Sequence, residues 1–426
     1  MFRGEPWALN TILTGFLFFI VTLMLGTMMP GVMITNSVVF GVVPAHFTAA
    51  FLGWIGLVIL GAQLQFFRAI TAERRYEPEN LRPIYWGFAT LGVLLMIGGD
   101  LLRHGWMVVL GLVFYSITIV IHSFWIIPKI KNKLFKFPLN YLLGSHVFLV
   151  TGMILIWLQV LNDPLGLADN FEIIHVLTIG WISLNLQGAL IRALPMFLGQ
   201  VIDRSMRQWI DRHFVFSFVS NIVLLAGLIT SQSIITWIGG TLWLLVWLWV
   251  VVLLFRSIFL SKRSIEYPAT LWFIGPGLLF LAFGAMLGFH DAEAASGFPR
   301  AVHIHSSLLV GLSIIMIGAI NRITSFQMFT LAYTGRRDTG VAVSDFIKEK
   351  YMRVIAPGLL ISGFVVLLGF ARAASRPLML LGITGYVLFV LIFGIYLLRN
   401  YIHYRQQMKF AIPYDKKPSE VDNDAK

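Results

Sequence analysis

The chain has 426 residues, of which 58% are hydrophobic and only 12% are charged, and its mean hydropathy is +0.82. Soluble domains carry about 25% charged residues, so this composition excludes an ordinary soluble protein. The absence of cysteine excludes disulfides, Cys-ligated zinc, iron–sulfur clusters and covalently attached haem. The net charge of +12 lies in loops between apolar runs, and it therefore indicates membrane topology and anionic lipid rather than a nucleic-acid partner.

Apolar runs long enough to cross a bilayer recur along the whole chain. They predict an all-α polytopic membrane protein with about twelve transmembrane helices, at 8–29, 44–69, 84–100, 105–127, 139–161, 171–198, 214–230, 233–255, 269–289, 301–322, 354–371 and 377–399. The first run lacks the small-residue cleavage site of a signal peptide. We expect one transmembrane domain over 1–410, a polar, disordered tail over 411–426, and a basic cytoplasmic connector over 323–353.

The loops between the predicted helices alternate in charge. Basic loops such as "RAITAERRYEPENLRP" and "PKIKNKLFKFP" follow even-numbered helices, whereas "NDPLGLADN" and "HDAEAASGFP", which follow odd-numbered helices, are neutral or acidic. Lys and Arg are enriched in cytoplasmic loops. The pattern therefore predicts a multi-pass protein of a prokaryotic plasma membrane with both termini in the cytoplasm.

Three of the predicted helices resemble one another. The segment "GWIGLVILGA" in helix 2 matches "GWISLNLQGA" in helix 6, and helix 10 contains a Gly-Ala pair at the equivalent place. When the glycines Gly61, Gly188 and Gly318 are aligned, His46 and His303 both fall fifteen residues earlier. His175 and His305 both fall thirteen residues earlier. Helix 10 therefore combines the two histidine positions that helices 2 and 6 carry singly.

All three helices are predicted to enter the membrane from its outer face, so the four histidines should lie at a similar depth, roughly one turn inside the membrane. Ionisable residues within membrane spans mark functional sites by default. The alternative for each single histidine is a hydrogen bond between helices. Four histidines on three repeated helices favour a cofactor or metal site.

His303 and His305 are two residues apart on one helix, so their side chains should point about 200° apart around its axis. They cannot easily bind one small metal ion together, but they can bind two partners on opposite faces. Neutral imidazole is a common axial ligand of haem iron and also binds copper. The pattern therefore predicts two planar cofactors, one on each side of helix 10.

This arrangement resembles subunit I of the haem–copper oxidase and nitric oxide reductase superfamily. The resemblance covers nearly the whole chain: twelve helices with both termini inside, one histidine in helix 2, one in helix 6, and His-x-His in helix 10. The approach to helix 10, "GFHDAEAASGFPRAVHIH", is also similar. A more distant similarity is to the NnrS-type haem membrane proteins, whose typical motifs the chain lacks.

The resemblance implies a role for each histidine. His46 and His305 would be the axial ligands of a six-coordinate haem b, and His303 the proximal ligand of a second haem. His175 would bind a distal metal, which is copper in the oxidases. Arginines after helix 11 hold haem propionates in the family, which makes Arg372 and Arg376 candidates. For these two arginines, ordinary charge in an outer loop is the alternative.

The chain departs from the family pattern at the distal metal. The predicted helix 7 lacks the adjacent histidine pair that the family uses as further copper ligands, and no tyrosine lies near His175. Glu172 lies three residues before His175 and so on the same helix face. The pair could bind copper or iron, as carboxylates do in nitric oxide reductases. Alternatively, Glu172 interacts only with the helix dipole.

The resemblance therefore implies a membrane redox protein in which electrons pass from one haem to a second haem that binds O2 or NO. Turnover would make it an oxidoreductase of the terminal oxidase or nitric oxide reductase type. Its partners would be the lipid bilayer, a quinol or cytochrome electron donor and a small partner subunit. Two alternatives remain open: a non-catalytic protein that binds haem and NO or handles copper, and a secondary transporter without haem.

Overall fold

The computed structural model describes residues 6–35, 41–71, 81–126, 137–161, 170–197, 204–259, 270–293, 297–333, 343–371 and 375–408. These residues form helices and short connections, without strands. Within them, twelve helices are long and apolar enough to cross a membrane. The prediction of an all-α polytopic membrane protein is therefore confirmed. The tail at 411–426 lies outside the described residues.

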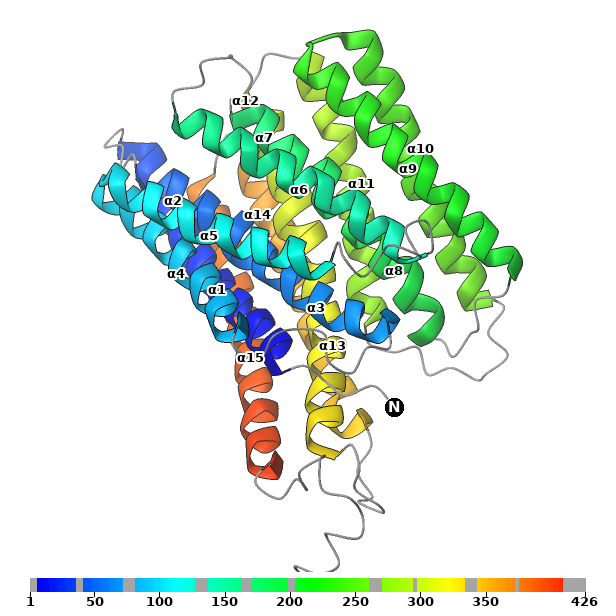
Figure 1. Cartoon of the computed structure of the whole chain (residues 1–426). Coiled ribbons are helices and arrows are strands. Elements are labelled where there is room, and N and C mark those ends of the chain that lie inside the picture. Colours follow the sequence, from blue (N-terminus) through cyan, green and yellow to red (C-terminus); the bar gives the residue numbers. More distant parts are fainter. Residues whose placement is uncertain are drawn as a thin grey trace, which may run out of the picture. The chain divides into compact units, whose positions relative to one another are not determined.

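The chain forms two compact units. Unit 1 comprises residues 1–72 and 269–426, and unit 2 comprises residues 73–268. The helices of unit 1 are α1 (Pro6–Thr35), α2 (Val42–Thr48), η1 (Ala49–Gly56), α3 (Leu57–Thr71), α11 (Leu271–Glu293), α12 (Gly297–His305), η4 (Ser306–Leu312), α13 (Ser313–Tyr333), η5 (Val343–Phe346), α14 (Glu349–Ala371) and α15 (Arg376–Met408) (Figure 1).

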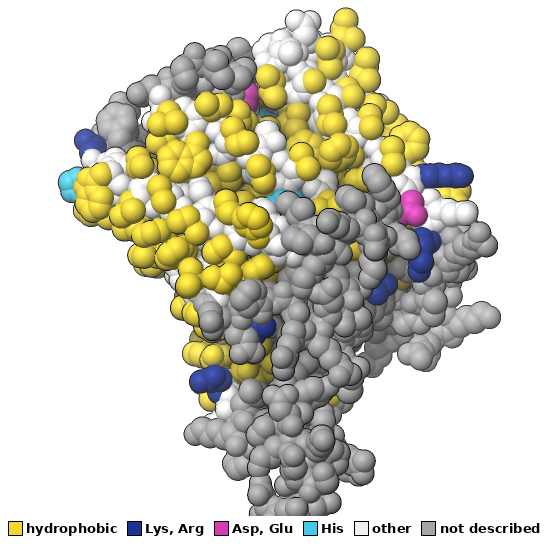
Figure 2. All heavy atoms as spheres, viewed as in Figure 1, with side chains coloured by type: hydrophobic (Ala, Val, Ile, Leu, Met, Phe, Trp, Pro, Cys, Tyr) yellow, Lys and Arg dark blue, Asp and Glu magenta, His cyan; other side chains and the backbone are white. Residues whose placement is uncertain are grey.

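Unit 2 also consists of helices in the part of the chain that the structure describes. Its helices are α4 (Leu81–Leu102), α5 (Gly105–Ile126), α6 (Leu139–Val160), α7 (Asn170–His175), η3 (Val176–Ile182), α8 (Ser183–Phe197), α9 (Arg204–Ile229) and α10 (Ser233–Phe259). Figure 2 shows mainly hydrophobic side chains on the visible surface of its helices. Large apolar residues such as Phe124 and Ile234 are more than two-thirds exposed. In water these side chains would be unfavourable, whereas lipid is their natural solvent.

Three helices change from α- to π-helical geometry at equivalent positions. The π-helical segments η1, η3 and η4 begin at Ala49, Val176 and Ser306, each twelve residues before the aligned Gly-Ala pair. In each case the α-helix that precedes it along the chain, α1, α6 or α11, packs against the π-helical segment. Wider π-turns occur mostly at functional sites. The repeat seen in the sequence is therefore also a repeat in backbone geometry.

Each π-helical element is followed along the chain by a helical hairpin: α4–α5, α9–α10 or α14–α15 (Figure 1). Glycines allow the hairpin helices to pack closely. An added Cβ at Gly111 of α5 would lie 2.5 Å from the carbonyl oxygen of Gly92 on α4. Small residues at such contacts are typical of helix pairs in membranes. The same four-helix pattern thus occurs three times along the chain.

The predicted end of helix 10 at 322 is wrong, because the helix continues to Tyr333. Polar residues after position 320 end the apolar run, yet Gln327 on this extension is buried, and its side chain donates a hydrogen bond to Gln65 at 3.0 Å. A cluster around Phe346 holds the last turns of the helix. It consists of Leu9, Met328, Leu331, Ala332, Tyr333, Phe346 and Tyr404. Much of the predicted connector at 323–353 is therefore folded.

Candidate functional site

The side chain of His46 is fixed between two helices of unit 1. Its Nδ1 atom lies 2.9 Å from the carbonyl oxygen of Thr22 on α1. A carbonyl oxygen only accepts hydrogen bonds, so Nδ1 carries the proton and donates. The ring packs on Gly26, where an added Cβ would lie 3.2 Å from Cε1. The neutral imidazole therefore presents the lone pair of Nε2 away from its anchoring bond.

His303 repeats this arrangement at the start of helix 10. Its Nδ1–H donates to the carbonyl oxygen of Gly284 on α11 at 2.6 Å. The ring packs on Gly288, where an added Cβ would lie 2.7 Å from Cε1. In both cases the preceding helix along the chain, α1 or α11, supplies a carbonyl acceptor and, four residues later, a glycine. Two segments far apart in sequence thus build the same cradle for an imidazole.

His305 lies on the same helix but has different neighbours. Its Nδ1–H donates to the carbonyl oxygen of Ala301, one turn earlier, at 2.8 Å. Its ring lies against Phe370 of α14, with the ring centroids 4.4 Å apart. His303 instead faces Gly284 and Gly288 of α11. The two imidazoles therefore face different helices, as the spacing along the helix predicts.

His46 and His305 both lie in unit 1, although 259 residues separate them in sequence. In the described part of the chain, the Nε2 atoms of His46, His303 and His305 make no hydrogen bond. Histidines that bind metals usually donate their other ring N–H to a carbonyl or carboxylate. The three side chains have the tautomer and the anchoring that an axial ligand requires.

His175, the fourth histidine, lies in unit 2 at the end of α7, directly before η3. Its Nδ1–H donates to the carbonyl oxygen of Phe171 at 2.7 Å, and its ring lies 4.2 Å from the Phe171 ring. Glu172 is half-buried in the same short helix. Among the described residues, no group of three His, Cys, Asp or Glu side chains could hold a metal ion. The structure therefore adds no third protein ligand to the predicted pair.

Other histidines within the membrane spans are used differently. His213 of α9 has both ring nitrogens occupied: Nδ1 accepts from the Tyr141 hydroxyl at 2.5 Å, and Nε2 donates to the Val246 carbonyl at 3.1 Å. His122 and His146 bond to the hydroxyl groups of Tyr85 and Ser123. Anchoring through Nδ1 to a backbone carbonyl is thus found at all four predicted site histidines, whereas the Nδ1 of His213 bonds to a hydroxyl group instead.

The two predicted propionate ligands receive little further support. Arg372 lies outside the described residues. Arg376 is the first residue of α15 and is exposed. Their predicted role stays a prediction.

Sequence reasoning missed the residues that hold the rings. Gly26 and Gly288 follow leucines in "LGTMM" and "LGFHD", and each lies on the helix before a histidine helix. A search for a repeat in these helices too could have found the pair. Phe370 gave no such signal, because one phenylalanine among 35 in an apolar chain is ordinary.

Comparison with known proteins assigns no family to this chain. No protein-family model matches it, and no curated protein matches it. The function must therefore be argued from the histidines and their surroundings.

Proposed function

We propose that the chain is a haem-binding redox protein of the membrane, similar to the catalytic subunits of terminal oxidases and nitric oxide reductases. One observation carries the proposal. Within unit 1, His46 and His305 lie on separate helices, and both donate Nδ1–H to a backbone carbonyl. Two neutral imidazoles with available Nε2 atoms are the axial ligand set of a six-coordinate haem.

The surroundings of the two histidines fit a flat, apolar group. Gly26 removes a side chain beside the His46 ring, and Phe370 lies along the His305 ring. Such a group would be excluded from water inside the span and held by packing as well as by the imidazoles. When bound, haem supplies one-electron redox chemistry and, where one axial position is open, a site for a diatomic ligand.

His303 is proposed to hold a second haem. Its cradle on α11 repeats that of His46, which supports the same chemical role for both rings. A haem with one axial histidine has an open position for O2 or NO. His175, with Glu172, is proposed to lie beside a distal copper or iron.

The proposal also includes an electron donor and an orientation in the membrane. Electrons would come from a quinol or a cytochrome, with or without a small partner subunit. The basic loops would face the cytoplasm of a prokaryotic cell, with both termini on that side.

The experiment is a reduced-minus-oxidised absorption spectrum of the purified protein, with and without carbon monoxide. We expect low-spin bands and a separate species that responds to carbon monoxide. His46→Ala and His305→Ala should each remove the low-spin bands, whereas His303→Ala should remove the carbon monoxide response. The matched control is His104→Ala, in the exposed turn between α4 and α5, and it should leave both signals unchanged. Absence of haem bands from the unsubstituted protein would overturn the proposal and favour a transporter.

A further inference from the structure

A tyrosine and a histidine form a buried pair in unit 2. Tyr141 of α6 is only 1% exposed, and His213 of α9 is fully buried. The Tyr141 hydroxyl lies 2.5 Å from Nδ1 of His213. Neither residue belongs to the set of predicted ligands, so the proposed function does not account for their contact.

A third group fixes the direction of the hydrogen bond in this pair. Nε2 of His213 lies 3.1 Å from the carbonyl oxygen of Val246, which only accepts, so Nε2 carries the proton of the ring. In the neutral imidazole Nδ1 is then an acceptor, and the Tyr141 hydroxyl donates to it. The carbonyl oxygen of Ile210 lies farther from this hydroxyl, at 3.4 Å. The phenol of Tyr141 therefore directs its proton at a base.

A base at this position changes how easily a tyrosine is oxidised. Loss of one electron makes the phenol a strong acid, so its proton leaves with the electron when a base lies within hydrogen-bond reach. Imidazole can take up a proton, whereas a backbone carbonyl cannot. Tyr386 shows the contrast, because it is equally buried but donates to the Leu309 carbonyl at 2.7 Å. Tyr141 thus has a proton acceptor that Tyr386 lacks.

A row of aromatic rings connects the pair to the surface of unit 2. The ring centroid of Trp249 lies 5.3 Å from that of His213 and 5.5 Å from that of Trp209, and His213 lies 6.0 Å from Tyr141. Aromatic rings in contact have such separations. Trp209 is 48% exposed, and Arg207 beside it is exposed as well, as expected at a membrane–water boundary. Because electron tunnelling weakens steeply with distance, these rings offer an electron a route out.

The other tyrosine–histidine pair of unit 2 lacks this route. Tyr85 lies 3.2 Å from Nδ1 of His122, a longer contact than that of Tyr141. The tryptophan beside Tyr85 is Trp125, at 4.9 Å between ring centroids, and this tryptophan is buried. A proton acceptor and an exposed tryptophan therefore occur together at Tyr141.

We propose that Tyr141 is a redox-active tyrosine, which gives one electron through Trp249 and Trp209 to an oxidised metal complex of high potential at the membrane surface. The metal complex is reduced, and Tyr141 becomes a neutral tyrosyl radical. Its O–H bond breaks, and the proton forms a new N–H bond at Nδ1 of His213. The imidazolium keeps Nε2–H on the Val246 carbonyl and returns the other proton when the radical is reduced. The proposal concerns unit 2 alone and does not depend on the haem sites.

The test generates the radical in the purified full chain. Tris(bipyridine)ruthenium(III), produced by a laser flash, is the oxidant, and electron paramagnetic resonance of rapidly frozen samples measures the radical. We expect a tyrosyl signal that narrows when the protein contains ring-deuterated tyrosine. Tyr141→Phe should reduce the signal several-fold, whereas the control Tyr386→Phe, which also removes one buried hydroxyl, should leave it unchanged. Absence of the signal from the unsubstituted protein, or an equal signal in Tyr141→Phe, would overturn the proposal.

The role of His213 is tested by substitution and by isotope. His213→Gln retains a hydrogen-bonding side chain that cannot take up the proton, so the radical yield should fall several-fold. Circular dichroism shows whether this variant is folded. In the unsubstituted protein the radical should form more slowly in D2O than in H2O, because the proton moves with the electron. An unchanged yield in the folded variant would overturn proton transfer to His213, and if the variant does not fold, equal rates in the two solvents would do so.

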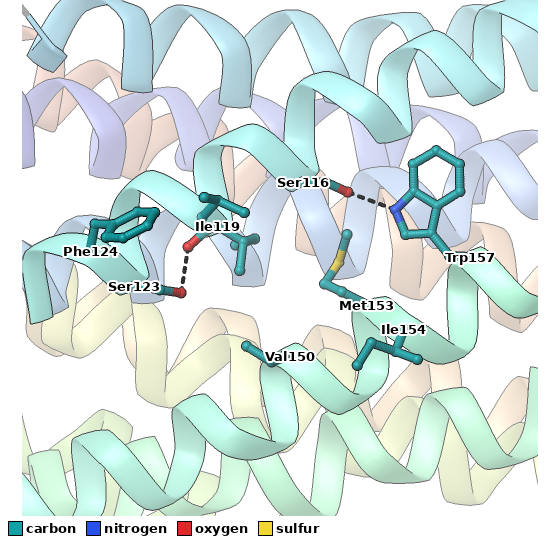
Figure 3. A pocket seen from close by; sticks show the side chains of 9 residues that line it. Ser116, Ile119, Ser123, Phe124, Val150, Met153, Ile154 and Trp157 are labelled. Carbon is teal, nitrogen blue, oxygen red and sulfur yellow. Dashed lines mark hydrogen bonds between the residues drawn. The ribbon is translucent and has the colours of Figure 1, made fainter. Parts of the chain in front are cut away.

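A further pair of variants tests the route of the electron. Trp249→Phe keeps an aromatic ring that is much harder to oxidise, so the yield of the Tyr141 radical should fall several-fold. The control is Trp157→Phe, sixteen residues from Tyr141 on α6, which corresponds to roughly 24 Å along the helix. Trp157 lines a cavity between α5 and α6, where its Nε1–H donates to Ser116 at 2.9 Å (Figure 3). Equal yields in the two variants would overturn the route through Trp249. Haem content, measured on the same samples, reports separately on the proposed function.

Discussion

The imidazole of His303 lies directly on Gly288, so closely that a methyl group at this glycine would come within 2.7 Å of the ring carbon Cε1. Side-chain atoms do not approach this closely without displacement. The ring can occupy its position, and donate to the Gly284 carbonyl, only because α11 has no side chain there. Gly288 is therefore a positioning residue for His303.

Gly288→Ala should displace the His303 ring and weaken its bond to the Gly284 carbonyl. We expect the carbon monoxide-responsive haem to be lost or shifted in spectrum, while the low-spin bands of the other site remain. Absorption spectroscopy of the purified variant measures both. The control is Gly275→Ala on the same helix, where an added Cβ meets nothing within 4 Å. Equal spectra for the two variants would contradict the assigned role.

The corresponding change beside the other site is Gly26→Ala. An added methyl would lie 3.2 Å from Cε1 of His46 and 3.5 Å from its Nδ1. This approach is less severe than at Gly288, so a small movement of the ring can relieve it. We expect a shift of the low-spin bands or of their midpoint potential, rather than their loss. A redox titration of the variant measures this. An unchanged potential together with unchanged bands would count against His46 as a ligand.

The twelve spans and the equivalence of His46 and His303 could be predicted from the sequence, because apolar length and a repeated Gly-Ala register are local signals. The acceptor of each Nδ1–H could not. Thr22 and Gly284 contribute only backbone oxygens, which no residue type identifies. The π-helical segments were also missed, since their starts, Ala49, Val176 and Ser306, share no side-chain type.

The end of helix 10 could not be predicted from hydropathy, because it depends on a contact with a distant residue. Gln327 is polar, and on hydropathy it belongs to a loop, but its partner Gln65 on α3 lies in a distant part of the sequence. Buried polar groups are tolerated when they are hydrogen-bonded. A local pattern contains no information on such a partner, so helix length was underestimated there.

Ser313 should be important for the π-helical geometry of η4. Its hydroxyl donates to the Leu308 carbonyl five residues earlier at 2.8 Å and accepts from Nε1–H of Trp54 at 3.1 Å. Ser313→Ala leaves the buried Trp54 donor unsatisfied, which typically costs about 1–3 kcal/mol. Unfolding in detergent, followed by circular dichroism, should show this loss. Ser233→Ala, at the exposed start of α10, should change stability by less than about 0.5 kcal/mol.

Phe346 should stabilise the extension of α13 beyond the apolar run. Its side chain is buried in the cluster with Met328 and Tyr404, and its carbonyl oxygen accepts from Tyr396, Asn400 and Ser325. Phe346→Ala removes this packing, at a cost of about 3–5 kcal/mol. We expect a lower unfolding midpoint and faster proteolysis at the end of α13, near Tyr333. Phe326→Ala, which changes an exposed phenylalanine on α13, is the control and should have a much smaller effect.

The distal metal can be tested apart from the haem. If Glu172 and His175 bind a second metal, the purified protein should contain copper or non-haem iron in addition to haem iron. His175→Ala should then remove this metal, and Glu172→Gln should weaken its binding, because a neutral amide is a poorer ligand than a carboxylate. Metal analysis against haem content measures both, with His104→Ala as the control at an exposed position.

The haem bands should persist in both variants, since neither residue belongs to unit 1. A metal-to-haem ratio that is unchanged in His175→Ala would show that the metal is bound elsewhere. Absence of any extra metal from the unsubstituted protein would overturn the proposed metal site at His175.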